Sequence, residues 1–170
     1  GSMSRAIYLA NILGVDMGMY YKRLDYSKNV GGRHPVAAYE FLGPNVAGKD
    51  MILIDDMISS GETILKIASL LKERGAGRIY LCSTFGLFTD NLKKFDEAHA
   101  AGVFDKLLTT NMVYQSDELL SKPYYISCDM SKYIALIIDT LNHDMSVSHL
   151  LNPVDRIKRC VNNYMAQYEK

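Results

Sequence analysis

The residues best suited to chemistry lie in one thirteen-residue segment, Met51–Thr63. Four apolar residues come first, then the paired carboxylates Asp55 and Asp56, and then a turn rich in serine, glycine and threonine. Backbone N–H groups at the start of a helix bind anions, and hydroxyl side chains add further donors. Carboxylates accept hydrogen bonds from sugar hydroxyl groups. The segment therefore predicts a site for a phosphorylated sugar, with the phosphate on the turn and the hydroxyls on the two acids.

The same residues also have a plainer interpretation. Ser59 or Ser60 can serve only as the N-cap of the following helix, since serine is a preferred residue at that position. Asp55 and Asp56 would then be solvated residues at the end of a strand. The acids and the serine–glycine turn by themselves do not separate these two interpretations.

The elements that must position this segment follow an alternating pattern. Short apolar runs alternate with amphipathic stretches, which is typical of an α/β fold with a mostly parallel sheet. We predict a parallel sheet of five or six strands with helices on both faces. The expected strands are 17–21, 38–42, 51–54, 78–84, 103–109 and 124–128. The expected helices are 6–13, 64–71, 91–101, 133–141 and 157–168, with Gly14 and Gly75 ending the first two. Ligands of such sheets bind beyond the carboxyl ends of the strands, where the acids and the turn are expected.

The first predicted element is a helix, although a parallel sheet normally begins with a strand that leads into its helix. We therefore expect the chain to be a fragment whose first strand is missing. Residues 1–3 are interpreted as an expression scar from cloning. Residues 4–151 are expected to form the domain, and residues 152–170 an additional C-terminal helix for packing or assembly.

Composition excludes several classes of protein. The 170 residues carry 19 basic and 19 acidic side chains, for a formal net charge of zero, and 48% are hydrophobic. This balance argues against a disordered chain and against a general binder of nucleic acid or anionic membranes. The longest apolar runs are far shorter than the ~20 residues that a membrane-spanning helix needs. We predict no membrane and no nucleic-acid partner.

Cysteine and histidine usage points to a reducing compartment without a transition metal. Cys82, Cys128 and Cys160 are odd in number and widely spaced in apolar stretches, which favours buried thiols. The four histidines form no pair at metal-ligand spacing. The sequence therefore predicts a cytoplasmic protein without a metal site of its own.

The Met51–Thr63 segment resembles the phosphoribosyl-binding motif of the type I phosphoribosyltransferase fold. Further matching segments follow in one order, and they include the Arg-Gly-Ala-Gly-Arg within Leu71–Tyr80, the Ser83-Thr-Phe-Gly-Leu-Phe run and the Ser-Val-Ser within Met145–Leu151. This order is similar to the C-terminal half of ribose-phosphate diphosphokinases, also called PRPP synthetases. The resemblance extends from about Ser4 to Leu151.

The resemblance implies a function and a set of site residues. PRPP synthetases transfer the diphosphoryl group of Mg²⁺-ATP to O1 of ribose 5-phosphate. Matched by position, Asp55 and Asp56 would bind the ribose hydroxyls, and Lys22 would be the catalytic-loop lysine, with Arg23 beside it. The residues that would hold the 5-phosphate are Ser59, Ser60, Gly61, Glu62 and Thr63. The residues that match a regulatory phosphate-binding turn at a subunit contact are Ser146, Val147 and Ser148.

Departures from the family pattern leave alternatives open. Leu24 stands where the family usually has an arginine, so Arg23 or Arg33 would have to supply that charge. Glu62 adds negative charge beside the phosphate turn, and we expect it to point away. The family's ATP-binding loop lies in its N-terminal half, so ATP and Mg²⁺ would bind through that half and the chain alone would be inactive. The resemblance also implies a homo-oligomer.

Two other functions remain open from the sequence. One is a non-catalytic regulatory subunit that associates with a synthetase, which Leu24 favours. The other is a nucleobase phosphoribosyltransferase that uses PRPP, although no segment here indicates the base-recognition region that such an enzyme needs.

Overall fold

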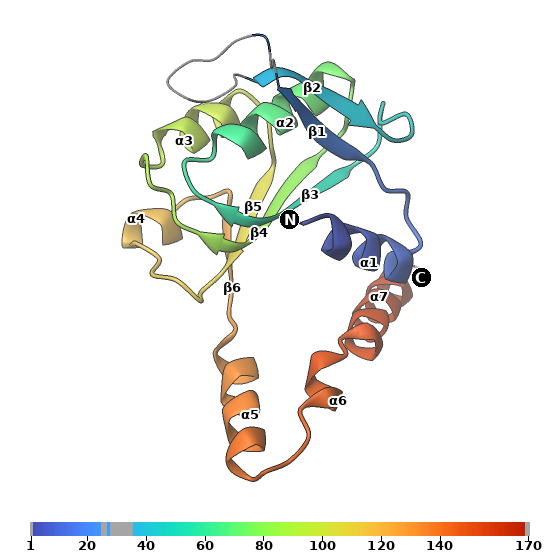
Figure 1. The fold of residues 1–170 in the computed structure, drawn as a ribbon, viewed down its shortest axis with the longest axis vertical. Coiled ribbons are helices and arrows are strands. Elements are labelled where there is room, and N and C mark those ends of the chain that lie inside the picture. The colour runs from blue at the N-terminus through green and yellow to red at the C-terminus, as the bar shows by residue number, and fades with distance from the viewer. Residues whose placement is uncertain (1, 25–26, 28–35, 169–170) are drawn as a thin grey trace.

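The computed structural model describes residues 2–24, 27 and 36–168 (Figure 1). The strands are β1 Met19–Leu24, β2 Val36–Leu42, β3 Met51–Ile58, β4 Ile79–Gly86, β5 Lys106–Thr110 and β6 Tyr125–Cys128. The helices are α1 Met3–Leu13, α2 Glu62–Glu73, α3 Lys93–Ala100, α4 Asp117–Leu120, α5 Ser131–Asn142, α6 Ser148–Leu151 and α7 Val154–Tyr168. The short helices α4 and α6 were not expected from the sequence.

The described strands form two sheets. β3, β4, β5 and β6 make a parallel sheet in that order, and β1 pairs with β2 as a separate antiparallel hairpin. The predicted α/β fold and all six strand positions are confirmed. The predicted five or six parallel strands are wrong, because two of the six strands pair with each other. Strands joined without a crossover element pair antiparallel, since parallel pairing requires the chain to return to the same end of the sheet.

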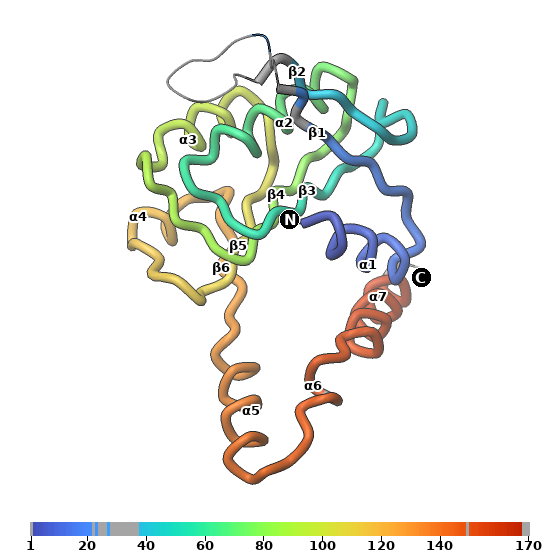
Figure 2. The backbone as a smooth tube through the Cα atoms, viewed as in Figure 1, coloured from blue at the N-terminus to red at the C-terminus, as the bar shows by residue number. Residues whose placement is uncertain are grey.

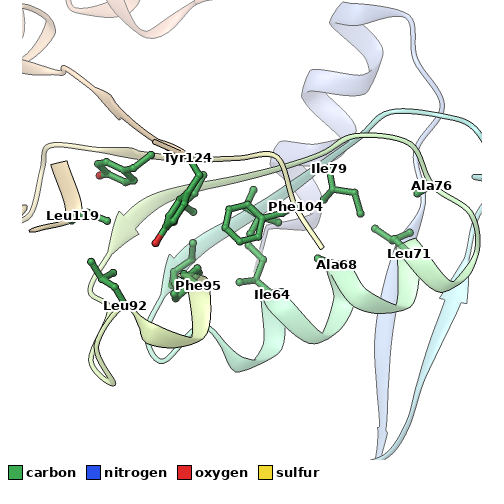
Figure 3. Close-up of a cluster of buried hydrophobic side chains, with 14 of the residues drawn as sticks. Ile64, Ala68, Leu71, Ala76, Ile79, Leu92, Phe95, Phe104, Leu119 and Tyr124 are labelled. Carbon is green, nitrogen blue, oxygen red and sulfur yellow. The ribbon is translucent and has the colours of Figure 1, made fainter. Parts of the chain in front are cut away.

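One face of the parallel sheet holds the hydrophobic core (Figure 3). Ile64, Ala68 and Leu71 of α2 and Phe95 of α3 are buried against it. These α2 residues are spaced at the three- and four-residue intervals of one helix face, as the sequence predicted. The Phe95 ring meets the ring of Phe104 edge to face at a centroid distance of 6.4 Å. This face therefore fixes the positions of α2 and α3 on the sheet.

The opposite face is covered much less completely. α1 lies over it and ends at Gly14 with φ 65°, as the sequence predicted, but none of its residues is buried. Ile52 of β3 is 58% exposed. After β6 the chain leads away from the sheet as α5 and returns through α6 and α7, which lies beside α1 (Figures 1 and 2). Tyr133 of α5 donates a hydrogen bond to the Leu150 carbonyl at 2.7 Å, which ties α5 to α6.

The predicted α5 and α7 helices are present, but their apolar stripes stay in solvent in the single chain. Ile138 and Leu141 of α5 are exposed, as are Tyr164 and Met165 of α7. All three cysteines are free, and Cys160 is exposed, so the prediction of buried thiols is wrong for that residue. It lies on α7, most of whose residues are exposed. None of the helices in the described part of the chain is long and apolar enough to cross a membrane.

Candidate functional site

The two carboxylates lie inside β3, which continues to Ile58 instead of ending at Ile54 as predicted. Strand pairing explains the extra length, because Met57 and Ile58 still pair with Phe85 and Gly86 of β4. Successive side chains of a strand point to opposite faces. Asp55 and Asp56 therefore lie on different sides of the sheet.

Asp55 faces the turn that follows β3. It lines a cavity of about 220 Å³ together with the turn and the first residues of α2. The predicted site residues that share this cavity are Asp55, Ser59, Ser60, Gly61, Glu62 and Thr63. One Asp55 carboxylate oxygen accepts the backbone N–H of Asp56 at 2.8 Å, which fixes the orientation of the carboxylate. The structure thus brings one acid and the whole turn to one place.

Gly61 gives this turn its shape. Its φ of 83° is in the left-handed region, and a Cβ there would lie 2.3 Å from the Phe95 ring. Only glycine fits both demands without strain. The Gly61 carbonyl accepts the Leu65 N–H at 3.0 Å, so α2 begins directly at the turn. The first-turn amides of α2, which have no partners within the helix, consequently face the cavity side of the turn.

The turn is also held from the neighbouring strand. The N–H of Leu87 donates to the Ile58 carbonyl at 2.8 Å, and the N–H of Thr89 donates to the Ser59 carbonyl at 3.1 Å. The hydroxyls of Ser59 and Thr89 lie 3.4 Å apart. The sequence did not single out Thr89, which is thirty positions away in the chain. The β4–α3 loop therefore forms the second wall that supports the turn.

Glu62 is directed toward α3. Its carboxylate lies 3.0 Å from the Lys94 ammonium, which also lies 3.0 Å from Asp90. Hydrogen bonds to Glu62 and then to Asp90 raise the pKa of Lys94. The added acid in the turn is thus paired with a cation from α3. Sequence reasoning missed Lys94, because nothing in the linear pattern relates it to Glu62.

Asp56 lies on the side of the sheet that α1 covers. The Arg5 guanidinium of α1 is 2.7 Å from the Asp56 carboxylate and 3.0 Å from the Thr84 hydroxyl, to which it donates. The sequence did not single out Arg5 either. Asp56 therefore forms an ion pair with α1. Of the two acids, only Asp55 lines the cavity at the turn.

The remaining predicted site residues are not part of this cavity. Lys22 and Arg23 lie on β1, and Arg23 forms an ion pair with Glu40 of β2 at 2.9 Å. The Lys22 side chain, Arg33 and most of the predicted catalytic loop lie outside the described residues.

The predicted regulatory turn lies elsewhere in the molecule. The hydroxyls of Ser146 and Ser148 are 3.0 Å apart, and Val147 occupies the N-cap position of α6 without a side-chain hydrogen bond. Figure 1 shows α6 well apart from the start of α2. Within the described part of the chain, no group of three or more histidine, cysteine, aspartate or glutamate side chains is arranged to hold a metal ion.

The chain is similar to several known proteins over most of its length. The chain is 29% identical over 157 residues to a ribose-phosphate pyrophosphokinase of Vibrio parahaemolyticus, covering 89% of this chain and 46% of that protein. It is 31% identical over 149 residues to the enzyme of the same name from Pasteurella multocida, covering 87% and 44%. The chain thus spans about half the length of the curated relatives that it matches.

A solved structure shows the same fold. The crystal structure of phosphoribosylpyrophosphate synthetase from Mycobacterium smegmatis superposes with a TM-score of 0.68 at 22% identity, covering 84% of this chain and 42% of that one. The sequence model of the phosphoribosyl synthetase-associated domain matches residues 35–152. That match includes β3, the turn and α2, and the predicted resemblance to PRPP synthetases is confirmed. The chain belongs to the phosphoribosyl synthetase-associated domain family.

Proposed function

We propose that this chain is the ribose 5-phosphate-binding half of a PRPP synthetase, which transfers the diphosphoryl group of ATP to O1 of ribose 5-phosphate. One observation carries the proposal: Asp55 and the Ser59–Thr63 turn line a single cavity at the N-terminus of α2. The similarity to ribose-phosphate pyrophosphokinases supports the same reaction class.

The chemistry of the cavity suits the two ends of the substrate. The 5-phosphate would lie on the turn, where amide N–H groups, hydroxyls and the positive end of the α2 dipole favour an anion. Lys94 would keep Glu62 from repelling it. The Asp55 carboxylate would accept hydrogen bonds from the ribose hydroxyls, which lie at the other end of the molecule. These contacts orient the sugar and leave the diphosphoryl donor to approach from outside the cavity.

In this proposal, ATP and Mg²⁺ would bind to the other half of the enzyme. The described residues include no group of three or more histidine, cysteine, aspartate or glutamate side chains arranged to hold a metal ion. Mg²⁺ usually binds through one or two carboxylates and the phosphates of a nucleotide. The family resemblance supports further parts of the proposal. These are a catalytic loop with Lys22 and Arg23, a regulatory phosphate on the Ser146–Ser148 turn, homo-oligomeric assembly and a cytoplasmic location.

Calorimetric titration with ribose 5-phosphate in phosphate-free buffer tests the binding proposal. We expect saturable binding of ribose 5-phosphate and no binding of free ribose. Asp55→Asn should weaken binding by about tenfold or more, since hydrogen bonds to charged groups contribute about 1.5–3 kcal/mol. Asp139→Asn, in an exposed carboxylate of α5, is the matched control and should bind normally. Equal binding by wild type and Asp55→Asn would contradict the proposed sugar site.

A non-catalytic role in a synthetase complex is the second candidate. The observation that favours it is the ion pair of Arg23 with Glu40, which engages the cation nearest to the predicted catalytic lysine. Joining the chain to the N-terminal half of a relative and measuring AMP release from ATP and ribose 5-phosphate separates the two candidates. Turnover supports the enzyme, and binding without turnover supports the regulatory subunit.

A further inference from the structure

The loop between β4 and α3 lies against the Ser59–Thr63 turn. The N–H of Thr89 in this loop donates to the Ser59 carbonyl at 3.1 Å. The hydroxyls of the same two residues lie 3.4 Å apart. Ser59 lines the cavity at the turn, and Thr89 is exposed. A hydroxyl from a different part of the chain therefore lies beside the candidate phosphate position.

The two hydroxyls are farther apart than a good hydrogen bond requires. Hydrogen bonds between hydroxyl groups are usually about 2.7–2.8 Å long. At 3.4 Å, Ser59 and Thr89 gain little from each other. Two hydroxyls at this separation can both donate at about 2.7 Å to one phosphate oxygen, which is a strong acceptor. Their spacing thus suits an anion that both of them contact.

The backbone of the loop is strained at the residue before Thr89. Phe88 has φ 48°, in the left-handed region, which is rare for a bulky side chain and costs energy. The Phe88 ring packs edge to face against the rings of Phe95 and Tyr125, at centroid distances of 5.3 and 6.5 Å. Because these rings hold Phe88 in place, the backbone that follows it is fixed and keeps Thr89 against the turn.

The acidic side chains near Thr89 share a cation. Asp90, the next residue in the loop, lies 3.0 Å from the Lys94 ammonium. Glu62 of the turn lies 3.0 Å from the same ammonium. Lys94 therefore offsets part of the negative charge that would otherwise oppose an anion beside the two hydroxyls.

We propose that Thr89 is a further ligand of the 5-phosphate, and that its hydroxyl donates a hydrogen bond to a phosphate oxygen that the Ser59 hydroxyl also contacts. This inference rests on the proposed function, because it takes the phosphate to lie on the Ser59–Thr63 turn. It adds to that site a residue of the β4–α3 loop, outside the Met51–Thr63 segment. The bound phosphate would then join the start of α2 to the loop that leads into α3.

NMR titrations with inorganic phosphate and, separately, with ribose 5-phosphate test this inference through the amides of the Ser59–Thr63 turn. Thr89→Val keeps the branched shape and the backbone N–H but removes the hydroxyl. It should weaken the binding of both ligands by about tenfold, because a hydrogen bond to a charged group is lost. Thr89→Ser keeps the hydroxyl and should bind both within about twofold of wild type. Ser121→Ala removes a hydroxyl at the end of α4 and is the control that should bind normally.

Asp55→Asn separates this inference from the proposed sugar site. It should weaken binding of ribose 5-phosphate and leave binding of inorganic phosphate unchanged, whereas Thr89→Val weakens both. Equal binding by wild type and Thr89→Val, or equal losses in Thr89→Ser and Thr89→Val, overturns the Thr89 contact and leaves the proposed function standing. A loss confined to Thr89→Val, with ribose 5-phosphate bound no better than inorganic phosphate by wild type, supports the Thr89 contact and contradicts the sugar site. Absence of binding by either ligand overturns both. If the spectrum of unliganded Thr89→Val shows a disturbed loop, Thr89→Ala repeats the test.

Discussion

The two faces of the parallel sheet differ sharply in how completely they are covered. On the α2 and α3 face, Ala68 and Phe95 have no exposed surface. On the α1 face, Ile52 is mostly exposed and no residue of α1 is buried. The candidate phosphate turn is built on the first face, and Phe95 packs directly against Gly61. The tightly packed face positions the candidate turn, whereas the open face gives α1 no buried residue.

Core deletions on the two faces should give the largest difference. Phe95→Ala should lower the free energy of unfolding by about 3–5 kcal/mol, because it leaves a cavity between α2, α3 and the sheet. Ile52→Ala, on the open face, should cost less than about 1 kcal/mol. Urea unfolding followed by circular dichroism measures both. Similar losses for the two variants would show that the open face is packed in solution.

Substitutions of two glycines with positive φ should separate backbone strain from packing. Gly61→Ala should cost about 2–4 kcal/mol, because left-handed backbone strain adds to the overlap with Phe95. Gly48→Ala is the matched control, since Gly48 has φ 72° and no neighbouring atom within 4 Å of an added Cβ. It should cost only about 1–2 kcal/mol from strain. Equal costs, measured by urea unfolding, would mean that Phe95 does not press on the turn.

A polar contact at the rim of the buried face should give the smallest effect. Asp96 of α3 accepts hydrogen bonds from Lys122 and from the Tyr124 hydroxyl, both at 2.8 Å. The hydrogen bond from Lys122 is the main cause that lowers the pKa of Asp96. A lowered folded-state pKa stabilises the protein above the unfolded pKa of about 3.9, and that stability is lost as the pH falls through the folded pKa.

Melting temperatures between pH 7 and pH 3 measure this contribution. Asp96→Asn should reduce the loss of stability between pH 7 and pH 3. The reduction should be less than about 1 kcal/mol, because the Asp96–Lys122 ion pair is partly exposed. Glu97→Gln, one position later on the same helix, is the control and should leave the profile unchanged. A steeper acid loss in Asp96→Asn than in wild type would contradict the assignment.

Local patterns predicted much of the fold and the centre of the candidate site. The alternation of apolar runs and amphipathic stretches indicated the six strands, and glycine marked the ends of α1 and α2, where Gly14 and Gly75 both have positive φ. The Met51–Thr63 pattern located the turn at the start of α2. These features depend on neighbouring residues, so a single sequence carries them. The apolar faces of α5 and α7 were equally clear in the sequence. Whether another surface covers such a face depends on the assembled structure and not on neighbouring residues.

The sequence by itself determined that the chain forms an α/β fold with a serine- and glycine-rich turn between its third strand and the helix that follows. Only the tertiary structure decided that β1 and β2 pair with each other, that Asp55 meets the turn and that Asp56 meets Arg5 instead. It also brought Lys94 to Glu62 across 32 positions. Hydrophobic periodicity shows which face of a single helix or strand is apolar. The contacts above depend on which elements pack together and in what register, and the assembled core fixes both.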